Sequence, residues 1–363
     1  MTTNFEEKHW RTVVIGGGQA GLAVGRSLAG QGDDFVILDA SERVGDAWRT
    51  RWASLRLFTP AEHDGLPGVP FPAPAGTSPT KDELADYIAA YAERFDLPVR
   101  SGVRVLRLDR AGSGYRLLTT EGELTADRVV LATGTHPSPR RPRFADELAP
   151  EIRQLHSFDY RSPDAIGPGK VLVVGAGTSG VQIALDLAES HATSIAGRPT
   201  PQIPELLLRH LGGLFWWFIS HVLTVRTPMG RKARGEVRGS GGPLIHVPAG
   251  ELDRAGVARL PRVAGVQDGR PVLEDGRVLD VDTVIWATGF QPDFSWISFP
   301  VTDDSGWPAG DRGVSSLAPG LYFVGMPFQF GLTSGLVGGV GRDAAFVAEH
   351  LGRAESGPPP GLR

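Results

Sequence analysis

Apolar and polar positions follow the same strand, turn and helix pattern twice along the chain. A short apolar strand, Thr12–Ile15, runs into a glycine-rich turn and then into a helix with one apolar face that extends to Ala29. The stretch Val171–Ala188 repeats this order of elements. A strand that ends in glycines and opens directly into a helix is typical of a phosphate-binding unit. The pattern therefore predicts two such units in one chain.

The rest of the pattern surrounds each unit with further strands. A second strand, in DFVILDA, ends at Asp39, and two later strands, Val129–Gly134 and Val284–Gly289, both end in Ala-Thr-Gly. Small residues at a strand end let the chain pass close to a bound cofactor, although a tight strand end alone would also explain them. The irregular region Ser41–Ser78 is long for a compact domain, and such loops are usually functional. Thr80, followed by glutamate three residues later, predicts a capped helix start.

The order of elements predicts an α/β fold with two Rossmann-like dinucleotide-binding domains. The first domain is split into residues 1–160 and 290–363. The second domain, residues 161–289, is inserted between the two halves, and a tryptophan-rich helical insert is predicted near residues 203–245 within it.

The apolar stretch Glu205–Arg226 is long enough to cross a bilayer. However, Arg209, His210 and His221 lie within it, and Gly212–Gly213 interrupts it. Charges at the centre of a membrane span are costly. We therefore expect a helical insert that packs on a domain surface or over a pocket, and membrane contact is the less favoured alternative.

Composition narrows the classes of function. The chain has 363 residues, 41% of them hydrophobic, and a formal net charge of −4. Such a mildly acidic protein has no general attraction to nucleic acid or to anionic membranes. It has no cysteine, which excludes a disulfide, a thiolate metal site and a cysteine nucleophile. No metal site is predicted, and because the N-terminus lacks an apolar core segment we expect a cytoplasmic location.

The two glycine turns share one spacing. Their glycines are Gly16, Gly18 and Gly21 in the first copy and Gly175, Gly177 and Gly180 in the second. The first glycine makes the tight turn, the second admits a pyrophosphate, and the third lets the helix pack on the strand. One such motif is a weak signal, but both copies follow an apolar strand and open a helix, which is the context that supports them.

The two units differ at the end of the following strand. The offset between the copies is 159 residues, and applied to Asp39 it leads to Arg198. An acid at this place binds ribose hydroxyls and repels a 2′-phosphate, whereas an arginine attracts that phosphate. The first unit is therefore predicted to hold FAD or NAD and the second NADP. The structural alternative for Arg198 is a solvated surface arginine.

With these motifs the chain resembles the flavoproteins that have two dinucleotide-binding domains. Among them it is most similar to bacterial relatives of the flavin-containing monooxygenases, a group that includes the plant YUCCA enzymes. The motifs that carry the resemblance are GGGQAG, VGDAWRTRWASLRLFTP, VVLATGTH, VGAGTSG, AGR, WATGF and LYFVGMP, which span nearly the whole chain.

The resemblance implies two sets of cofactor-binding residues. FAD would be held by Gly16, Gly18, Gln19, Ala20, Gly21, Asp39, Trp48, Arg49, Val103, Thr133, Gly134, Gly335 and Leu336. NADPH would be held by Gly175, Gly177, Thr178, Ser179, Gly180, Arg198, Ala287, Thr288 and Gly289. Within these sets, Thr288 and Gly289 would lie where the two domains meet. The turn at Gly335–Leu336 would place a helix N-terminus near the pyrimidine edge of the flavin, where negative charge develops on reduction.

Two departures from the family pattern bear on the activity. The stretch PEIRQLHSFDY keeps His156 and Tyr160 of the monooxygenase fingerprint, but Pro150 and Ile152 stand where Phe and Gly are expected. Tyr160 in place of Trp disfavours the Baeyer–Villiger branch, and a hinge or core role explains His156 as well as a catalytic one. Many members have an Asn near the flavin where this chain has Phe58. That Asn helps to stabilise the oxygenated flavin, so Phe58 favours alternatives to oxygenation.

The resemblance implies an NADPH-dependent flavin monooxygenase of class B type. It would oxygenate a small organic nucleophile at nitrogen, sulfur or a carbonyl through a C4a-peroxyflavin. The alternative is an NADPH-dependent flavin reductase or dehydrogenase of a quinone- or imine-like acceptor without a stable oxygenated flavin. A flavoprotein sensor is disfavoured, since it needs only one nucleotide site.

Partners and pocket residues follow from the same hypothesis. The expected partners are a small-molecule substrate and molecular oxygen, with no nucleic acid and no membrane, and a homodimer is left open. No catalytic residue is identified. Phe58 and Gln329 are the pocket candidates. Trp216 and Trp217 are candidates for an apolar pocket wall, with core packing as the favoured alternative.

Overall fold

The structure is a computed structural model of the chain. It describes residues 8–134, 138–240, 243–246 and 250–355. Thr135 and His136 of the VVLATGTH motif therefore lie outside the described residues.

The larger sheet forms the core of the first half of the molecule. Among the described residues nine strands contribute to it, in the order β16-β17-β18-β6-β1-β2-β3, with β4 and β5 joined to β6. Their bounds are β1 Lys8–Ile15, β2 Phe35–Leu38, β3 Val99–Arg100, β4 Val105–Ala111, β5 Gly114–Thr119, β6 Gly122–Leu131, β16 Gly310–Asp311, β17 Val314–Ser315 and β18 Leu321–Phe323. The central strands β18, β6, β1 and β2 are parallel.

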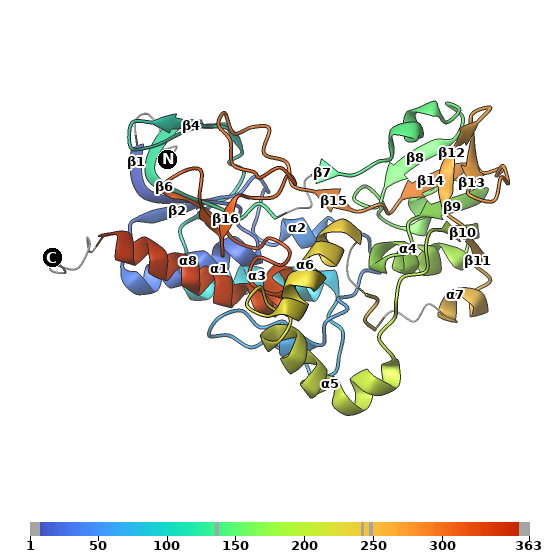
Figure 1. Ribbon diagram of the computed structural model, residues 1–363, viewed down its shortest axis with the longest axis horizontal. Helices are drawn as coiled ribbons and strands as arrows, with labels where there is room; N and C mark the ends of the chain where they lie inside the picture. The colour runs from blue at the N-terminus through green and yellow to red at the C-terminus, as the bar shows by residue number, and fades with distance from the viewer. Residues whose placement is uncertain (1–7, 135–137, 241–242, 247–249, 356–363) are drawn as a thin grey trace.

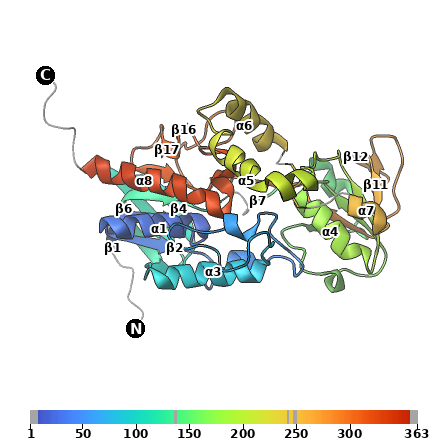
Figure 2. The ribbon, with the colours of Figure 1, turned by 90° about the horizontal axis from the view of Figure 1, so that it is seen from below.

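Alternation along β1 explains the two layers that cover this sheet. Val14 faces helices α1 (Gln19–Gln31), α3 (Lys81–Arg94) and α8 (Val340–Glu355) on one side. Val13 and Ile15 face the β4–β5 hairpin on the other side. Figure 1 shows the strands above these helices, and Figure 2 shows α1 between α3 and α8. The C-terminal helix thus returns to the first domain and closes its helical layer.

The smaller sheet is built from the middle of the chain. Its strands are β8 Arg153–His156, β9 Lys170–Val174, β10 Ala192–Ala196, β11 Ala258–Leu260 and β14 Thr283–Trp286. They are all parallel and lie in the order β11-β10-β9-β14-β8. Helices α4 (Thr178–Ala188) and α7 (Gly250–Arg254) cover one face, and a hairpin of β12 (Val263–Gln267) and β13 (Arg270–Leu273) covers the other. This is a second Rossmann-like layer arrangement, so the predicted α/β fold class is confirmed.

Two linker segments connect the sheets. Strand β7 (Ser138–Pro139) carries the chain out of the first sheet, and β15 (Phe290–Gln291) carries it back. The two segments pair antiparallel, and Figure 1 shows them between the two halves of the molecule. The division at residues 160 and 290 stays a prediction. Because β8 pairs with β14 in the smaller sheet, we propose that the chain crosses between domains at β7 and β15.

The stretch from 203 to 245 contains helices α5 (Glu205–His221) and α6 (Pro228–Ser240). Leu211 has non-helical dihedral angles, so α5 bends next to its glycine pair. The inner side of α5 forms an apolar cluster around Leu208, Trp216 and Ile219. A bridge between Thr224 and Gly331 joins the segment after α5 to the first domain. Among the described residues, no helix is long and apolar enough to cross a membrane.

Candidate functional site

The first glycine turn leaves a bare helix N-terminus beside the sheet. A β-carbon on Gly16 would lie 2.5 Å from the carbonyl oxygen of Ala132, and one on Gly21 would overlap the carbonyl oxygen of Gly16. By contrast, a β-carbon on Gly18 would meet nothing within 4 Å. Gly18 is also the N-cap of α1, and no side chain caps the helix there. The open side of the turn therefore presents free backbone N–H groups, which suits a pyrophosphate.

The second turn repeats this geometry. A β-carbon on Gly175 would overlap the carbonyl oxygen of Ala287, and one on Gly180 would overlap that of Gly175. The side of Gly177 is again open, and no side chain caps α4 at this glycine. Thr178 and Ser179 lie in the first turn of α4. Both units thus fit a dinucleotide phosphate.

The same contacts explain why a strand ends twice in Ala-Thr-Gly. Ala132 follows β6 and Ala287 follows β14, and each passes directly against the first glycine of its unit. A larger residue in either crossing would press on the turn. Thr133 and Gly134 therefore lie beside the first turn, and Thr288 and Gly289 lie beside the second.

Asp39 is fixed at the carboxyl end of β2. Its Oδ2 accepts a hydrogen bond from the backbone N–H of Gly17, and its Oδ1 accepts one from Ser41 at 2.7 Å. The backbone N–H of Val103 donates to the carbonyl oxygen of Asp39 at 2.9 Å. The carboxylate is thus held next to the glycine turn, at the edge where parallel strands present ligand-binding groups.

Strand register corrects the predicted counterpart of Asp39. The N–H of Gly16 donates to Leu38 at 2.8 Å, and the N–H of Gly175 donates to Ala196 at 2.8 Å. The residue after Ala196 is Gly197, so Gly197 occupies the place of Asp39 and Arg198 lies one position further on. The constant offset failed because the segment from turn to second strand is one residue shorter in the second unit. Arg198 is exposed in the loop after β10.

A cavity of about 270 Å³ lies beside the second turn, at the carboxyl ends of β10 and β11. Gly197 and Arg259 are among its lining residues. Arg259 lies on β11 opposite Ile195, and its guanidinium is 3.7 Å from Asp253. Sequence analysis missed this arginine, because nothing local marks a strand that follows a helical insert. Arg198 and Arg259 place two cations at this end of the second unit.

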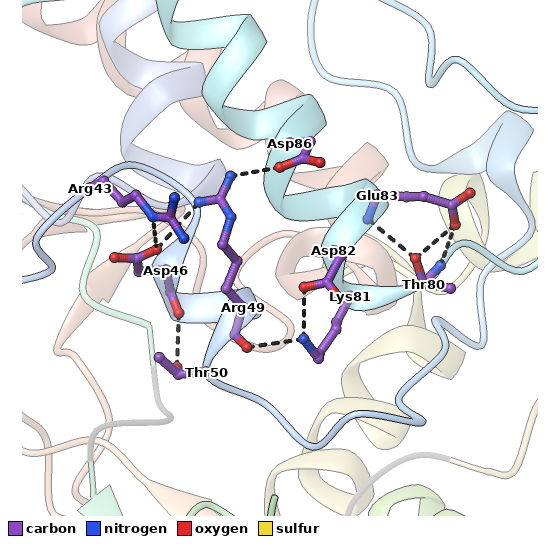
Figure 3. Close-up of polar contacts among 9 residues, drawn as sticks. All are labelled: Arg43, Asp46, Arg49, Thr50, Thr80, Lys81, Asp82, Glu83 and Asp86. Carbon is purple, nitrogen blue, oxygen red and sulfur yellow. Dashed lines mark hydrogen bonds and ion pairs between the residues drawn. The ribbon is translucent and has the colours of Figure 1, made fainter.

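Trp48 and Arg49 lie on a short helix, α2 (Asp46–Arg49), close to the first turn. The indole N–H of Trp48 donates to Gln19 at 3.3 Å, so the predicted residues Trp48, Gln19 and the turn are brought together. The Arg49 guanidinium donates to Asp46 at 3.3 Å and to Asp86 on α3 at 2.8 Å, as Figure 3 shows. The hydrogen bond to Asp86 raises the pKa of Arg49. Arg49 therefore fastens α2 to α3.

The start of α3 also holds α2 in place. Lys81 is buried, and its ammonium donates to the carbonyl oxygen of Arg49 at 3.0 Å. The predicted capping box is confirmed, because the Thr80 hydroxyl accepts from the N–H of Glu83 and the Glu83 carboxylate accepts from that of Thr80. The rigid start of α3 thus fixes the position of α2.

A second cavity, of about 190 Å³, lies between the insert and the first domain. It is lined by Glu62, His63, Gly65, Trp216, Ser220, Thr333, Leu336, Gly338 and Gly339. The rings of His63 and Trp216 lie 4.8 Å apart, and burial lowers the pKa of His63, so this ring is neutral at pH 7. Phe58 and Leu336 pack against the apolar cluster of α5 that includes Trp216. Trp216 therefore serves both as packing and as a cavity wall, whereas Trp217 is 53% exposed.

Asp64 stands between two residues that line this cavity, His63 and Gly65, and is fully buried. Its Oδ1 accepts a hydrogen bond from the Thr59 hydroxyl at 2.5 Å, and its Oδ2 has no hydrogen-bond partner among the described residues. Burial raises the pKa of Asp64 to about 7. Sequence analysis missed this residue, because its burial follows from the fold of the loop.

Two predicted positions near the last helix differ from expectation. Gln329 is buried, and its side-chain amide donates to the carbonyl oxygens of Phe323 at 2.8 Å and Arg312 at 3.2 Å. It therefore holds a turn and does not line the cavity. Helix α8 begins at Val340, and the short helices η4 (Leu332–Gly335) and η5 (Val337–Gly339) precede it. The turn at Gly335–Leu336 is thus an irregular segment ahead of the helix.

His156 and Tyr160 lie at the junction between the sheets. The Nε2 of His156 is 3.1 Å from the carbonyl oxygen of Gly289, and its ring lies 5.0 Å from that of Phe290. The Tyr160 hydroxyl donates to Asp186 of α4 at 2.7 Å. Burial lowers the pKa of His156. These contacts give His156 a structural place at the returning linker.

Thr288 and Gly289 belong to the same junction. The Thr288 hydroxyl donates to the carbonyl oxygen of Arg140, and the N–H of Arg140 donates to Gly289 at 3.0 Å. The second Ala-Thr-Gly segment therefore contacts the outgoing linker as well as the second glycine turn.

Comparison with known proteins agrees with this geometry. A family model described as pyridine nucleotide-disulphide oxidoreductase matches residues 13–201. An uncharacterized CzcO-like oxidoreductase of Geobacillus kaustophilus is 37% identical over 345 residues, which cover 93% of this chain and 97% of that protein. A probable indole-3-pyruvate monooxygenase of Arabidopsis thaliana, YUCCA8, is 28% identical over 94% of this chain and 88% of its own. The structure of a flavin-containing monooxygenase from Stenotrophomonas maltophilia matches with a TM-score of 0.79 and 28% identity, over 96% of this chain and 99% of that one.

Proposed function

The chain belongs to the pyridine nucleotide-disulphide oxidoreductase family, and from this premise we propose that it is an FAD- and NADPH-dependent monooxygenase of class B type. Its 363 residues include no cysteine, so it cannot reduce a disulfide through a cysteine pair of its own. What remains is hydride transfer from a nicotinamide to a flavin and use of the reduced flavin. The observation that carries the proposal is the pair of open glycine turns in one chain, joined by paired linkers.

The first unit would hold FAD. The backbone N–H groups beside Gly18 would bind its pyrophosphate, and the Asp39 carboxylate would accept hydrogen bonds from the adenosine ribose. Trp48 would lie beside the bound flavin, since its indole contacts Gln19 in the first turn of α1. Arg49 would position this segment through Asp86.

The second unit would hold NADPH. The N–H groups beside Gly177 would bind the pyrophosphate, and Arg198 together with Arg259 would bind the 2′-phosphate. Two guanidinium groups favour a doubly charged phosphate over a neutral hydroxyl. This unit would therefore select NADPH over NADH.

FAD bound at the first unit would supply the hydride-accepting and oxygen-activating chemistry. The chain's own contribution is to orient the two cofactors and to keep water out. Trp216, Leu336 and Phe58 form an apolar wall between the insert and the first domain. We propose that the cavity of about 190 Å³ beside this wall receives the substrate.

The lining favours a small, partly apolar nucleophile. His63 is neutral at pH 7 because its pKa is lowered, so it offers the cavity one donor and one acceptor without a charge. Ser220 and Thr333 add hydroxyl groups, and Trp216 adds an aromatic face. A thioether, an amine or a carbonyl compound of modest size would fit this chemistry.

The experiment is an electron and oxygen balance on the purified flavoprotein. NADPH oxidation, oxygen uptake and hydrogen peroxide release are measured with a panel of thioethers, amines and ketones under ¹⁸O₂. The proposal expects rapid flavin reduction by NADPH and a product that carries one ¹⁸O atom per NADPH consumed. If every electron pair appears as hydrogen peroxide with each substrate, while flavin reduction stays fast, the monooxygenase proposal is wrong.

Phe58 favours one second candidate, a reductase that passes electrons to a quinone- or imine-like acceptor. An apolar phenyl ring stands where many family members have an Asn, and it packs against the apolar cluster of the insert. In that case anaerobic turnover with a quinone would be as fast as aerobic turnover. A monooxygenase would turn over only with oxygen present.

Location and assembly belong to the proposal as well. We propose a cytoplasmic location, since a chain without cysteine needs no oxidising compartment. Molecular oxygen and a small molecule would be its partners in the reaction, and a homodimer is compatible with the fold.

A further inference from the structure

One surface of the insert concentrates the exposed apolar side chains of the molecule. Among the described residues, ten large hydrophobic side chains are exposed, and six of them fall between residues 206 and 229. These six are Leu206, Leu207, Leu211, Leu214, Trp217 and Met229. Scattered single exposures are ordinary on a protein, but a contiguous group marks an interaction site.

Helix α5 is apolar on two sides. Leu208, Trp216 and Ile219 face inward and are buried in the cluster that joins α5 to the first domain. Leu207, Leu211 and Leu214 follow a helical spacing on the other side and are 38%, 50% and 60% exposed. A helix that is apolar all round is normally covered on every side. The outer side of α5 therefore lacks its covering partner in the isolated chain.

The segment that contains α5 and α6 is rich in positive charge. Residues 205–238 contain six basic side chains against two acidic ones, whereas the whole chain has a formal net charge of −4. The basic residues are Arg209, Arg226, Arg231, Lys232, Arg234 and Arg238. All but Arg238 are exposed. The segment thus carries a net charge of +4, while the rest of the chain carries −8.

The two helices lie together at the periphery of the molecule. Figure 1 shows α5 at the lower edge, with α6 beside it, and Figure 2 also shows the two helices next to each other. Trp217 stacks on His221 with ring centroids 5.4 Å apart, near the end of α5. Exposed leucines beside a tryptophan and arginines are the composition of a helix that lies in a membrane interface.

We propose that the outer side of α5 and the exposed basic residues of α6, together called the insert surface, bind the surface of an anionic lipid bilayer. The leucines and Trp217 would enter the headgroup region, and the cations would neutralise lipid phosphates. The binding is peripheral, since none of the described helices can cross a membrane. A second copy of the chain is a poorer partner, because two insert surfaces with the same positive charge repel each other when they meet.

The expectation of no membrane partner, drawn from the overall charge, thus changes. The net charge of the whole chain is negative, but the segment 205–238 is positively charged. This inference does not rest on the proposed reaction, because bilayer binding needs neither substrate nor turnover.

The test is co-sedimentation of the FAD-loaded protein with vesicles. One set is pure phosphatidylcholine, and the other contains equal parts of phosphatidylcholine and phosphatidylglycerol. Binding is expected to the anionic vesicles, with weakening at high salt because the basic residues are screened. Binding to neither set, or equal binding to both at all salt concentrations, would overturn the proposal.

Two variant sets separate the apolar and charged parts. Leu207→Gln/Leu211→Gln/Leu214→Gln should weaken binding by roughly tenfold or more, since it removes the inserted side chains. Arg231→Gln/Lys232→Gln/Arg234→Gln should weaken it by roughly fivefold per charge. The matched controls are Leu106→Gln/Leu118→Gln and Arg104→Gln/Arg116→Gln, exposed positions on or next to the β4–β5 hairpin, which should bind as the parent does.

Sedimentation velocity without lipid distinguishes the rival occupant. A parent protein that dimerises and a triple leucine variant that is monomeric, with no vesicle binding by either, would assign the surface to a second copy. Unchanged thermal melting of the variants excludes unfolding as the cause of lost binding. If the leucine variants are unstable, the arginine and lysine variants still test the proposal.

Discussion

Gly197 occupies in the second nucleotide-binding unit the place that Asp39 occupies in the first. In each unit the preceding residue accepts a hydrogen bond from the first glycine of the turn, from Gly16 to Leu38 and from Gly175 to Ala196. The second residue of the turn differs in the opposite way. It is the smaller residue, Gly17, in the unit that has Asp39, and the larger residue, Ala176, in the unit that has Gly197. A β-carbon on Gly197 would lie 2.9 Å from the N and 3.1 Å from the Cβ of Ala176, and one on Gly17 would lie 2.9 Å from the Cβ of Asp39.

We propose that this exchange of sizes determines the choice of nucleotide. In the first unit a glycine at 17 leaves room for the Asp39 carboxylate. In the second unit the methyl group of Ala176 takes that room, and a glycine at 197 leaves no acid near the ribose. The 2′-phosphate of the nucleotide can then approach this position. The cations near it are Arg198, one residue after Gly197, and Arg259 on the neighbouring strand β11.

The first prediction concerns these cations. Arg198→Ala and Arg259→Ala should each raise the KM for NADPH by about ten- to a hundredfold, as expected for the loss of one charge-assisted phosphate contact. The KM for NADH should change by less than about twofold, since NADH has no 2′-phosphate. Steady-state NADPH and NADH oxidation by the purified flavoprotein measures both. Equal losses with the two nucleotides would show that the arginines act on the fold, and Arg262→Ala, on an exposed arginine after β11, is the control.

The second prediction reverses the exchange. Ala176→Gly/Gly197→Asp should create the Gly17–Asp39 arrangement in the second unit and shift preference from NADPH toward NADH by about a hundredfold in the ratio of kcat/KM. Gly197→Asp alone should instead lower the melting temperature, because its β-carbon meets Ala176. A double variant that still prefers NADPH to the original degree would contradict this account of selectivity.

Local patterns in the sequence were enough for the two units themselves. The strand, turn and helix around Gly16 and around Gly175 are encoded within short windows, so periodicity and glycine spacing identify them. The same holds for the start of α3, where Thr80 and Glu83 are three residues apart. Comparing the copies by a constant offset missed Gly197, because one residue fewer in the connection shifts every later position.

The parts that sequence analysis missed depend on contacts between distant segments. Arg259 lines the cavity beside the second glycine turn only because β11 pairs with β10, although the insert separates the two strands in the sequence. Asp64 is buried only because its loop packs under η5, where a β-carbon on Gly338 would overlap the carbonyl oxygen of His63. The role of Gln329 was missed for the same reason, since its partners are Phe323 on β18 and Arg312 in the turn between β16 and β17. Such placements follow from the folded topology.

The third prediction tests the fastening of α2. Arg49→Ala removes the hydrogen bonds to Asp86 and Asp46 and should lower the fraction of flavin retained on purification, with a loss of stability of about 1–3 kcal/mol. Flavin absorbance per protein and thermal melting measure these effects. Arg43→Ala is the matched control, because Arg43 binds the same Asp46 but is 69% exposed, and it should retain normal flavin content. A wild-type flavin content in Arg49→Ala would show that α2 needs no such fastening.

The last prediction concerns pH and the buried carboxyl of Asp64. Its pKa is about 7 in the folded protein against a reference value of 3.8, so between these values the folded protein holds a proton that the unfolded chain has lost. The free energy of unfolding therefore falls as pH rises through this window and becomes level above about pH 7.

Asp64→Asn keeps the acceptor for Thr59 and abolishes the titration. It should flatten the slope between pH 5 and pH 7 and stabilise the protein at pH 8 by up to about 4 kcal/mol. Denaturant unfolding at both ends of the window measures the difference, with Asp109→Asn on β4 as a control whose pKa is lowered by its hydrogen bond to Ser298 and by Arg107. If Asp64→Asn and the parent lose stability in parallel from pH 5 to pH 8, the carboxyl is ionised in the folded state and the polar groups around it stabilise its charge.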